Sequence, residues 1–138
     1  MMHNSLLSRV SLATIVALFI GSAVSAHHSF GATYDQAKEK EMKLQGKLVQ
    51  FAYRNPHSFV HIEAPDKAGT IQRWAIEWGG TAQLANAGVK RDSLKVGDEV
   101  VIIVSPSRVP GEFRALMVNL VRPSDGFAWG RRPGEAVE

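Results

Sequence analysis

Two stretches in the middle of the chain alternate apolar and polar residues, and this period constrains the fold more than any other feature. Residues 57–64 place Val60 and Ile62 on one face. Residues 70–78 likewise place Trp74, Ile76 and Trp78 on one face. A period of two is typical of a strand with one buried face. We therefore predict two half-buried strands here, joined as a hairpin by the loop between them.

Three further runs of strand-forming residues make a set of five, separated by turn residues. A short helix is predicted between the third and fourth runs, because Thr81 can cap its start and Gly88 can end it. The five predicted strands are 43–53, 57–64, 70–78, 98–104 and 113–121. The order β-β-β-α-β-β predicts a mainly β fold, a five-stranded OB-like barrel. Another small sandwich, or an open sheet with one helix, is the alternative.

The strand pattern carries three finer expectations. The apolar parity of the first predicted strand switches just after Gly46, which indicates a β-bulge between there and Val49. Residues 100–104 are apolar on both parities, as in a strand that is buried on both faces. Trp74 and Trp78 lie on the same face of the strand as Ile76, so we expect both tryptophans to pack in the barrel core.

The first 26 residues have the pattern of a secretory signal peptide. Arg9 is the only side-chain charge before the apolar run 10–20, and a small-residue sequence ends at Ala26. This run is too short to cross a membrane, because roughly 20 apolar residues are needed to span about 30 Å of hydrocarbon. We predict cleavage after Ala26 and a periplasmic or secreted protein with no stable membrane span. An uncleaved amino-terminal anchor is the alternative.

Composition divides the remaining chain into three parts. Residues 27–42 form a predicted polar arm, 43–123 hold the OB-like barrel domain, and 124–138, where Gly, Pro and Arg are frequent, form a flexible tail. The chain has no cysteine, which excludes disulfides and thiolate metal sites. Its 16 basic and 13 acidic residues are interspersed, so no nucleic acid is expected as a partner.

Six short motifs follow one another along the chain. They are His27-His28-Ser29-Phe30, Asn55-Pro56-His57, Trp74 with Glu77, Arg91-Asp92-Ser93-Leu94, Val96-Gly97-Asp98-Glu99-Val100 and Arg114-Ala115. Together they resemble a family of small exported bacterial proteins of uncharacterised role, domain of unknown function 6152. The resemblance covers nearly all of the chain after the leader. It implies a periplasmic OB-like domain and no established activity, so it assigns no catalytic residue.

The histidines beside the predicted cleavage site are candidate metal ligands. Cleavage after Ala26 would give His27 a free α-amine, and the amine and imidazole of one residue can chelate a single ion. With His28, or with His57 or His61 from the barrel, this set is rich in nitrogen and suits Cu(II) best. His57 and His61 cannot bind one ion together, because four strand steps of roughly 3.3 Å separate them by about 13 Å. The alternative is a polar chain end with no selected metal affinity.

His57 also has a candidate partner on the third predicted strand. If the hairpin loop sets a register in which Glu63 faces Ile71, then Glu77 lies opposite His57. A carboxylate that orients an imidazole is common at metal and acid–base sites. The alternative is a structural pair, and a register shift of two residues would separate the two side chains.

No catalytic signature is present: the nucleophile elbow, the zinc-protease helix, the phosphate-binding loop and the dinucleotide fingerprint are all missing from the sequence. We therefore predict a non-enzymatic exported protein that binds a transition metal such as copper. One alternative is a module that binds a peptide, a glycan or an envelope protein across the barrel face around Tyr53, Phe59, Arg73 and Glu77. A structural accessory protein with no small ligand is the other.

Overall fold

The structure, a computed structural model, describes residues 29–130 of the chain. The predicted signal peptide, His27, His28 and residues 131–138 of the predicted tail lie outside the described residues. Among the residues that are described, no helix is long and apolar enough to span a membrane.

The chain divides into two units, Met1–Thr33 and Tyr34–Glu138. In the first, the structure describes one short helix, α2, over Ser29–Thr33. The elements of the second are η1 (Lys38–Lys40), β1 (Met42–Ala52), β2 (Phe59–Pro65), β3 (Ile71–Glu77), α3 (Thr81–Asn86), β4 (Glu99–Pro106), β5 (Arg114–Arg122) and β6 (Phe127–Gly130).

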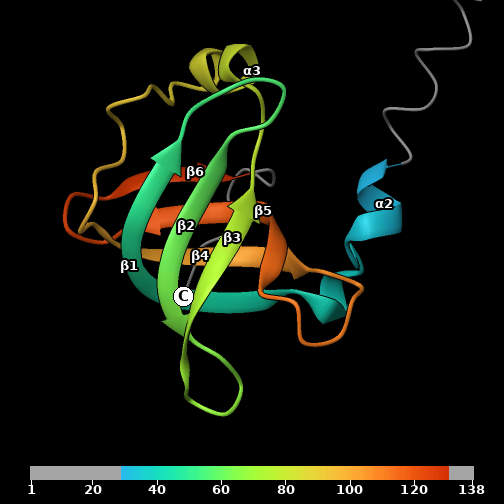
Figure 1. Cartoon of the computed structure of the whole chain (residues 1–138). Helices are drawn as coiled ribbons and strands as arrows, with labels where there is room; N and C mark the ends of the chain where they lie inside the picture. Colours follow the sequence, from blue (N-terminus) through green and yellow to red (C-terminus); the bar gives the residue numbers. More distant parts are fainter. Residues whose placement is uncertain (1–28, 131–138) are drawn as a thin grey trace, which may run out of the picture. The chain divides into compact units, whose positions relative to one another are not determined.

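Strands β1 to β5 form a closed barrel (Figure 1). Neighbouring strands follow the order β3-β2-β1-β4-β5-β6, and a parallel pairing of β3 with β5 joins the two sides of the curved sheet. At this seam Ala75 pairs with Arg114, and Glu77 pairs with Leu116. Since α3 also lies between β3 and β4 in the chain, the predicted OB-like barrel is confirmed.

Strand β1 pairs with β4 through its first half and with β2 through its second half. Its register against β2 shifts between Leu48 and Gln50, which confirms the predicted bulge. Gly46 allows the neighbouring strand to approach closely, because a Cβ atom there would lie 2.1 Å from the carbonyl oxygen of Glu63. The bulge and the missing side chain together let β1 bend from one side of the barrel to the other.

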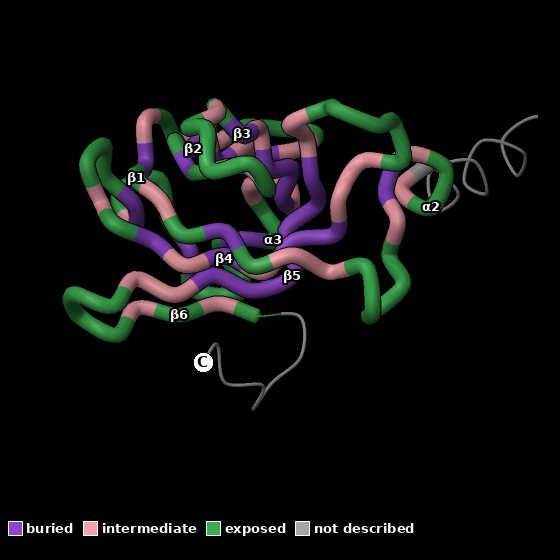
Figure 2. The backbone as a smooth tube through the Cα atoms, turned by 90° about the horizontal axis from the view of Figure 1, so that it is seen from below, coloured by how far each residue is buried: buried purple, intermediate pink, exposed green. Residues whose placement is uncertain are grey.

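The alternating apolar residues of β2 and β3 are buried, and Figure 2 shows buried positions along both strands. Val60, Ile62, Trp74 and Ile76 are all buried, and so is Trp78 just after β3. Both tryptophans therefore belong to the core, as predicted. Their Nε1 atoms have no hydrogen-bond partner among residues 29–130, whereas a buried indole N–H usually has one.

The strand that is buried on both faces is β5, and the prediction for residues 100–104 is wrong in this respect. In β4, Val101 and Ile103 remain half-buried. In β5, every residue from Ala115 to Leu120 is buried. β5 lies between β4 and β6 and also pairs with β3, so it has more strand neighbours than β4. The apolar composition of a strand does not reveal how many neighbours it has.

A loop side chain binds the start of α3. Gly80, not Thr81, precedes the first helical residue, and Asn55 supplies the missing cap. Its Oδ1 accepts hydrogen bonds from the Thr81 backbone N–H at 2.9 Å and from the Thr81 hydroxyl at 3.0 Å. Gly88 has a φ of 80° at the other end, so its predicted role as the helix stop is confirmed. The β1–β2 loop is thereby tied to α3.

Strand β6 adds to the barrel beyond its predicted end. A turn over residues 123–126 leads into β6, which pairs with β5, so the strand region continues past the predicted boundary at 123 to Gly130. Trp129 packs edge-on against Trp78, with ring centroids 5.0 Å apart. Gly and Arg near the end of the chain favoured a tail, but the aromatic residues at 127 and 129 give this segment an apolar side that packs against the core.

Candidate functional site

His57 and Glu77 are in contact, although the register that predicted the contact is wrong. Strands β2 and β3 pair with Glu63 opposite Arg73 and with Phe59 opposite Glu77, a shift of two residues from the expected register. His57 lies before the start of β2 and reaches Glu77 diagonally, so that its Nδ1 is 2.6 Å from Oε1 of the carboxylate. Because His57 reaches Glu77 diagonally, the two side chains stay in contact despite the two-residue register shift that was expected to separate them.

The hairpin turn explains the different register. The Asp66 N–H donates to the Thr70 carbonyl at 2.8 Å, so that the loop contains the three residues 67–69 instead of five. The Asp66 carboxylate also accepts hydrogen bonds from the backbone N–H groups of Ala68 and Thr70, and Gly69 has a φ of 82°. These contacts stabilise the tighter turn, which moves every cross-strand partner by two residues.

Two residues that were not predicted to belong to a site complete the surroundings of Glu77. Arg114, the first residue of β5, donates from Nη2 to Glu77 Oε2 at 2.8 Å and from Nε to the Tyr34 hydroxyl at 2.8 Å. The Tyr34 hydroxyl in turn donates to Glu77 Oε2. Tyr34 is fully buried, and its backbone forms a β-bridge with Ser107. The Glu77 carboxylate is therefore held from three directions.

These contacts decide the charges around Glu77. Burial acts to raise the pKa of Glu77, but hydrogen bonds from Tyr34 and Arg114 and the positive charges of Arg114 and His57 outweigh it, so the pKa lies below its ordinary value. Burial, followed by the hydrogen bond to Glu77 and the carboxylate charge, raises the pKa of Tyr34. At neutral pH the cluster thus holds a carboxylate, a guanidinium and a neutral phenol.

Phe59 lies beside this cluster on the outside of the barrel. It is half-buried, and its neighbour Val60 points into the core. The guanidinium carbons of Arg54 and Arg114 lie 5.5 and 5.9 Å from its ring centroid, and the His61 ring stacks on it at 6.3 Å. We call this group the outer-face site; it comprises Arg54, His57, Phe59, His61, Arg73, Glu77 and Arg114.

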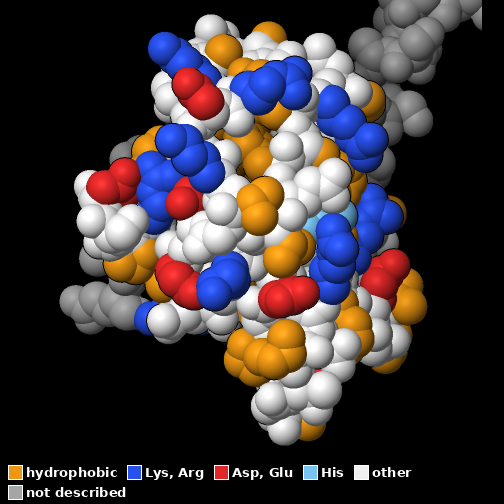
Figure 3. All heavy atoms as spheres, turned by 60° about the vertical axis from the view of Figure 1, so that its left-hand side comes forward, with side chains coloured by type: hydrophobic (Ala, Val, Ile, Leu, Met, Phe, Trp, Pro, Cys, Tyr) orange, Lys and Arg blue, Asp and Glu red, His pale blue; other side chains and the backbone are white. Residues whose placement is uncertain are grey.

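Arg73 extends the outer-face site along β3. Its side chain is exposed, and its Nη2 lies 3.4 Å from Oε1 of Gln50 on β1. Burial lowers the pKa of His61, and the positive charges of Arg73 and Arg54 lower it further. Figure 3 shows a histidine surface next to Lys and Arg side chains. The potential at this end of the site is therefore positive.

Of the four residues predicted to form a partner-binding face, Tyr53 does not join the other three. Its hydroxyl donates to the carbonyl oxygens of Thr81 at 3.0 Å and Val89 at 3.3 Å. Ala52 is the residue that pairs with Phe59, so Tyr53, one position later, has the opposite parity. It ties the end of β1 to α3, whereas the remaining three residues share the outer face.

The predicted metal ligands do not converge within the described part of the chain. Residues 29–130 contain no group of three or more His, Asp and Glu side chains that could hold an ion. His57 binds Glu77, and His61 stacks on Phe59. His27 and His28 lie outside the described residues, so copper binding at the amino terminus stays a prediction.

Weak sequence signals point to the residues that were missed. Tyr34 is an aromatic residue in a polar arm, Arg54 precedes the Asn55-Pro56-His57 motif, and Arg114 belongs to one of the short motifs. No local pattern brings them together, because Tyr34 and Arg114 are 80 positions apart. Only closure of the barrel places them side by side.

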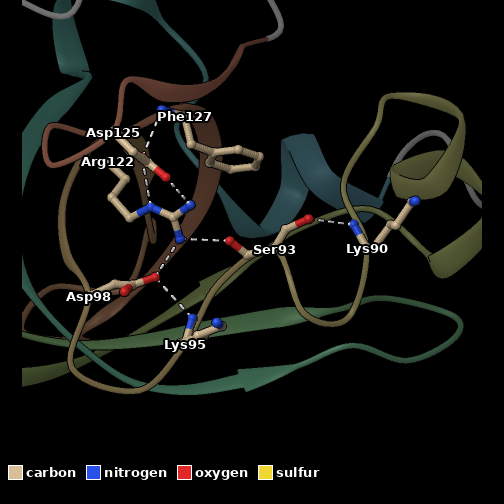
Figure 4. A network of polar contacts seen from close by, with 7 residues as sticks. All are labelled: Lys90, Ser93, Lys95, Asp98, Arg122, Asp125 and Phe127. Atoms are coloured by element: carbon tan, nitrogen blue, oxygen red, sulfur yellow. Dashed lines mark hydrogen bonds and ion pairs between the residues drawn. The ribbon is translucent and has the colours of Figure 1, made fainter.

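A second cluster of charges surrounds Arg122 (Figure 4). Its Nη1 donates to the Asp98 carboxylate at 2.6 Å and to the Ser93 carbonyl at 2.7 Å. Its Nε and Nη2 donate to the two oxygens of Asp125 at 2.9 and 2.7 Å. The backbone N–H of Lys95 donates to Asp98. This Arg122 network, comprising Ser93, Lys95, Asp98, Arg122 and Asp125, ties the loop before β4 to the β5–β6 turn.

A pocket of about 370 Å³ lies between the β2–β3 turn and the loop that joins β4 to β5. Trp74, Phe113 and Val109 contribute to its mainly apolar lining. Its acidic residues Asp66 and Glu112 form hydrogen bonds with nearby residues of their own turns. The pocket therefore offers volume but few groups that could recognise a ligand.

Comparison with known proteins defines a family and no activity. The model of the family of unknown function (DUF6152) matches residues 15–114, more than half of the chain. No curated protein and no solved structure matches the sequence. All seven residues of the outer-face site fall within the matched range.

Proposed function

The chain belongs to the family of unknown function DUF6152, and we propose that it is a binding module whose ligand lies on the outer face of β2 and β3. The proposed ligand is a peptide, a glycan fragment or another envelope protein, met in the periplasm to which the predicted leader directs the chain. The position of Phe59 carries the proposal. The guanidinium groups of Arg54 and Arg114 both lie over this half-buried aromatic ring, on the face that OB folds use for ligands.

Support also comes from how firmly the site is held. Glu77 fixes Arg114 through an ion pair of 2.8 Å and His57 through a contact of 2.6 Å. Tyr34 supports both Glu77 and Arg114 from the interior. A surface whose side chains are already ordered loses less conformational entropy when a ligand binds.

The other sequence hypotheses have less support from the described residues. Copper binding depends on His27 and His28, and in residues 29–130 neither His57 nor His61 belongs to a group of three potential ligands. A purely structural accessory role leaves the cations around Phe59 without a purpose, whereas ligand binding uses them. The outer-face site is therefore the basis of the proposal.

The test is a set of NMR titrations on protein purified from cells that express the full chain. The probes are a tetrapeptide library, maltotetraose, trigalacturonate and Cu(II), each added to the unaltered protein and to Phe59→Ala. We expect at least one organic probe to shift amide signals of β2 and β3, and the shifts to disappear in Phe59→Ala. Val96→Ala, which removes an exposed apolar side chain from a distant loop, is the matched control and should bind normally.

Two results would contradict the proposal. One is the absence of any organic probe that shifts signals at the outer-face site. The other is binding that Phe59→Ala leaves unchanged. Binding of Cu(II) that is micromolar or tighter and indifferent to Phe59→Ala would favour the amino-terminal copper hypothesis instead.

A further inference from the structure

We infer that the ligand of the outer-face site carries carboxylate groups, which Arg54 and Arg73 bind at the two ends of the Phe59–His61 ring stack. This inference rests on the proposed function and names the chemistry of its ligand. An acidic peptide and an acidic oligosaccharide are the two sources of carboxylates that fit such a site.

The first observation is a pair of arginines without acidic partners. Within residues 29–130, neither the Arg54 nor the Arg73 guanidinium forms an ion pair with a carboxylate. Arg54 lies over the Phe59 ring, and Arg73 has only a long contact with Gln50. Guanidinium groups bind carboxylates through two parallel hydrogen bonds, so both arginines are ready to receive an anion.

The second observation is the shortage of negative charge on this face. The acidic residues on the outer face of β1, β2 and β3 are Glu63 and Glu77. Glu77 is already bound by Arg114 and His57, while Glu63 lies between Lys47 and Arg73 in the register. The cations of this face therefore outnumber the acids that could neutralise them.

The third observation is the effect of this charge on His61. Arg73 and Arg54 add to burial in lowering the pKa of His61, because both positive charges disfavour a charged imidazole beside Phe59. A carboxylate bound there would offset their charge and raise the pKa of His61. Besides these two arginines, the charged groups on the outer face are Lys43 and Lys47 on β1, Glu63 on β2 and Glu77 on β3, and Arg114 of β5 lies over the Phe59 ring.

The arrangement favours isolated carboxylates over a nucleic acid. Non-specific binding of single strands uses open aromatic faces on which bases stack. Here the Phe59 ring is already in contact with two guanidinium groups and with the His61 ring. A base could stack only by displacing them, whereas a carboxylate needs only the exposed guanidinium groups.

The experiment compares five probes at low ionic strength. Pentaglutamate and trigalacturonate supply carboxylates, pentaglutamine and maltotriose are their neutral counterparts, and a five-residue oligothymidylate supplies phosphodiesters. Affinity is measured by NMR titration, and the pKa of His61 is measured from its imidazole signals with and without each probe. We expect one acidic probe to bind, to raise the pKa of His61, and to bind more tightly than its neutral counterpart.

Variants locate the binding. Arg54→Gln and Arg73→Gln should each weaken binding of the acidic probe about tenfold, the effect of one charge-assisted hydrogen bond. Arg91→Gln is the matched control, because Arg91 is an exposed arginine that lies over Tyr53, away from the outer-face site. The affinity of the Arg91→Gln variant for the acidic probe should stay unchanged. All three variants should have the same unfolding curve as the parent protein.

Each outcome decides the inference. Preference for pentaglutamate identifies a peptide as the source of carboxylates, and preference for trigalacturonate identifies a glycan. The inference is overturned if neither acidic probe binds, if both arginine variants bind normally, if the pKa of His61 does not rise, or if oligothymidylate binds more tightly. Neutral probes that bind in a Phe59-dependent way while acidic probes do not would overturn the inference and leave the proposed function standing.

Discussion

The outer-face site and the Arg122 network are both built on an arginine bound to carboxylates, but they bury opposite partners. In the Arg122 network the arginine side chain is only 14% exposed, while the Asp125 side chain is 53% exposed. In the outer-face site the Glu77 side chain is only 7% exposed, while that of Arg114 is 41% exposed. One cluster directs acidic groups outward, and the other directs cationic groups outward.

This difference separates a structural role from a binding role. Nε and both terminal nitrogens of Arg122 donate to partners within the chain, and these bonds connect the loop before β4 to the β5–β6 turn. Arg114 uses Nε and Nη2 to reach Tyr34 and Glu77, and among the described residues its Nη1 forms no hydrogen bond. An arginine whose three side-chain nitrogens all donate within the chain stabilises the fold, whereas one that leaves a terminal nitrogen for another partner can still bind a ligand.

The largest effect is expected for Arg122→Met. This change leaves Asp98 and Asp125 without their cation and releases the Ser93 carbonyl, so we expect the free energy of unfolding to fall by about 3 kcal/mol. Urea unfolding measures it. Arg91→Met, at an exposed arginine over Tyr53, is the control and should stay within about 0.5 kcal/mol of the parent. A loss for Arg122→Met no larger than that of the control would show that the network is not structural.

A smaller effect is expected for Glu77→Gln. The amide keeps the shape of Glu77 and can still accept hydrogen bonds, and water can solvate the half-exposed Arg114, so we expect a loss of about 2 kcal/mol. Urea unfolding again provides the number, with Glu63→Gln as the exposed control on the same face. If Glu77→Gln cost as much as Arg122→Met, the contrast between the two clusters would not hold.

Acid should weaken the two clusters to different extents. The pKa values of Glu77 and Asp98 lie below their ordinary 4.5 and 3.8, and that of Asp125 is lowered to about 2. A carboxyl with a lowered pKa stabilises the folded state above its unfolded pKa, and this contribution is lost as the pH falls through the folded pKa. The contribution of these carboxylates should therefore be constant above about pH 5 and decline below that. The lowered pKa of His61 adds a separate loss, which begins as the pH falls toward the ordinary histidine value of 6.5 and is common to both clusters' variants.

The slope of this decline distinguishes the clusters. Hydrogen bonds from Arg122 are the main cause of the low pKa of Asp125. For Asp98, burial opposes the shift, and bonds from Lys95 and Arg122 outweigh it. Arg122→Met should therefore flatten the acid decline more than Glu77→Gln, which removes one titrating group. Urea midpoints between pH 7 and pH 2 measure the slopes, and equal slopes in the two variants would contradict the expectation.

The smallest effect on stability is expected for Arg54→Gln and Arg73→Gln. Both side chains are exposed and lack ion-pair partners within residues 29–130, so each change should alter the free energy of unfolding by less than about 0.5 kcal/mol. Thermal and urea unfolding should both agree with the parent. A loss above about 1 kcal/mol would assign these arginines to the fold and weaken their role in binding.

Much of the barrel could be predicted from local patterns. The alternation around Val60 and Trp74 identified the buried face, and the parity switch after Gly46 identified the bulge. The helix stop at Gly88 was also predictable, because it depends on a backbone angle that glycine adopts easily. These features are encoded by residues close together in the sequence, so few alternatives compete with them.

The candidate site could be predicted only in part. The pairing of His57 with Glu77 was expected from a five-residue hairpin loop, yet the bonds of Asp66 close a three-residue loop and shift the register. The contact survives because a long side chain can reach a diagonal neighbour. Tyr34 and Arg114 could not be placed, because their positions depend on how the barrel closes.

The amino-acid order by itself determined where the five barrel strands form, which face of β2 and of β3 is buried and where the helix stops, since side-chain period and backbone preference act over a few residues. The tertiary structure decided which strand is enclosed on both faces and which charges meet around Glu77. Those outcomes depend on the parallel seam between β3 and β5, which joins segments far apart in the chain. Local patterns contain no information about such a seam, because its contacts exist only after the chain has folded.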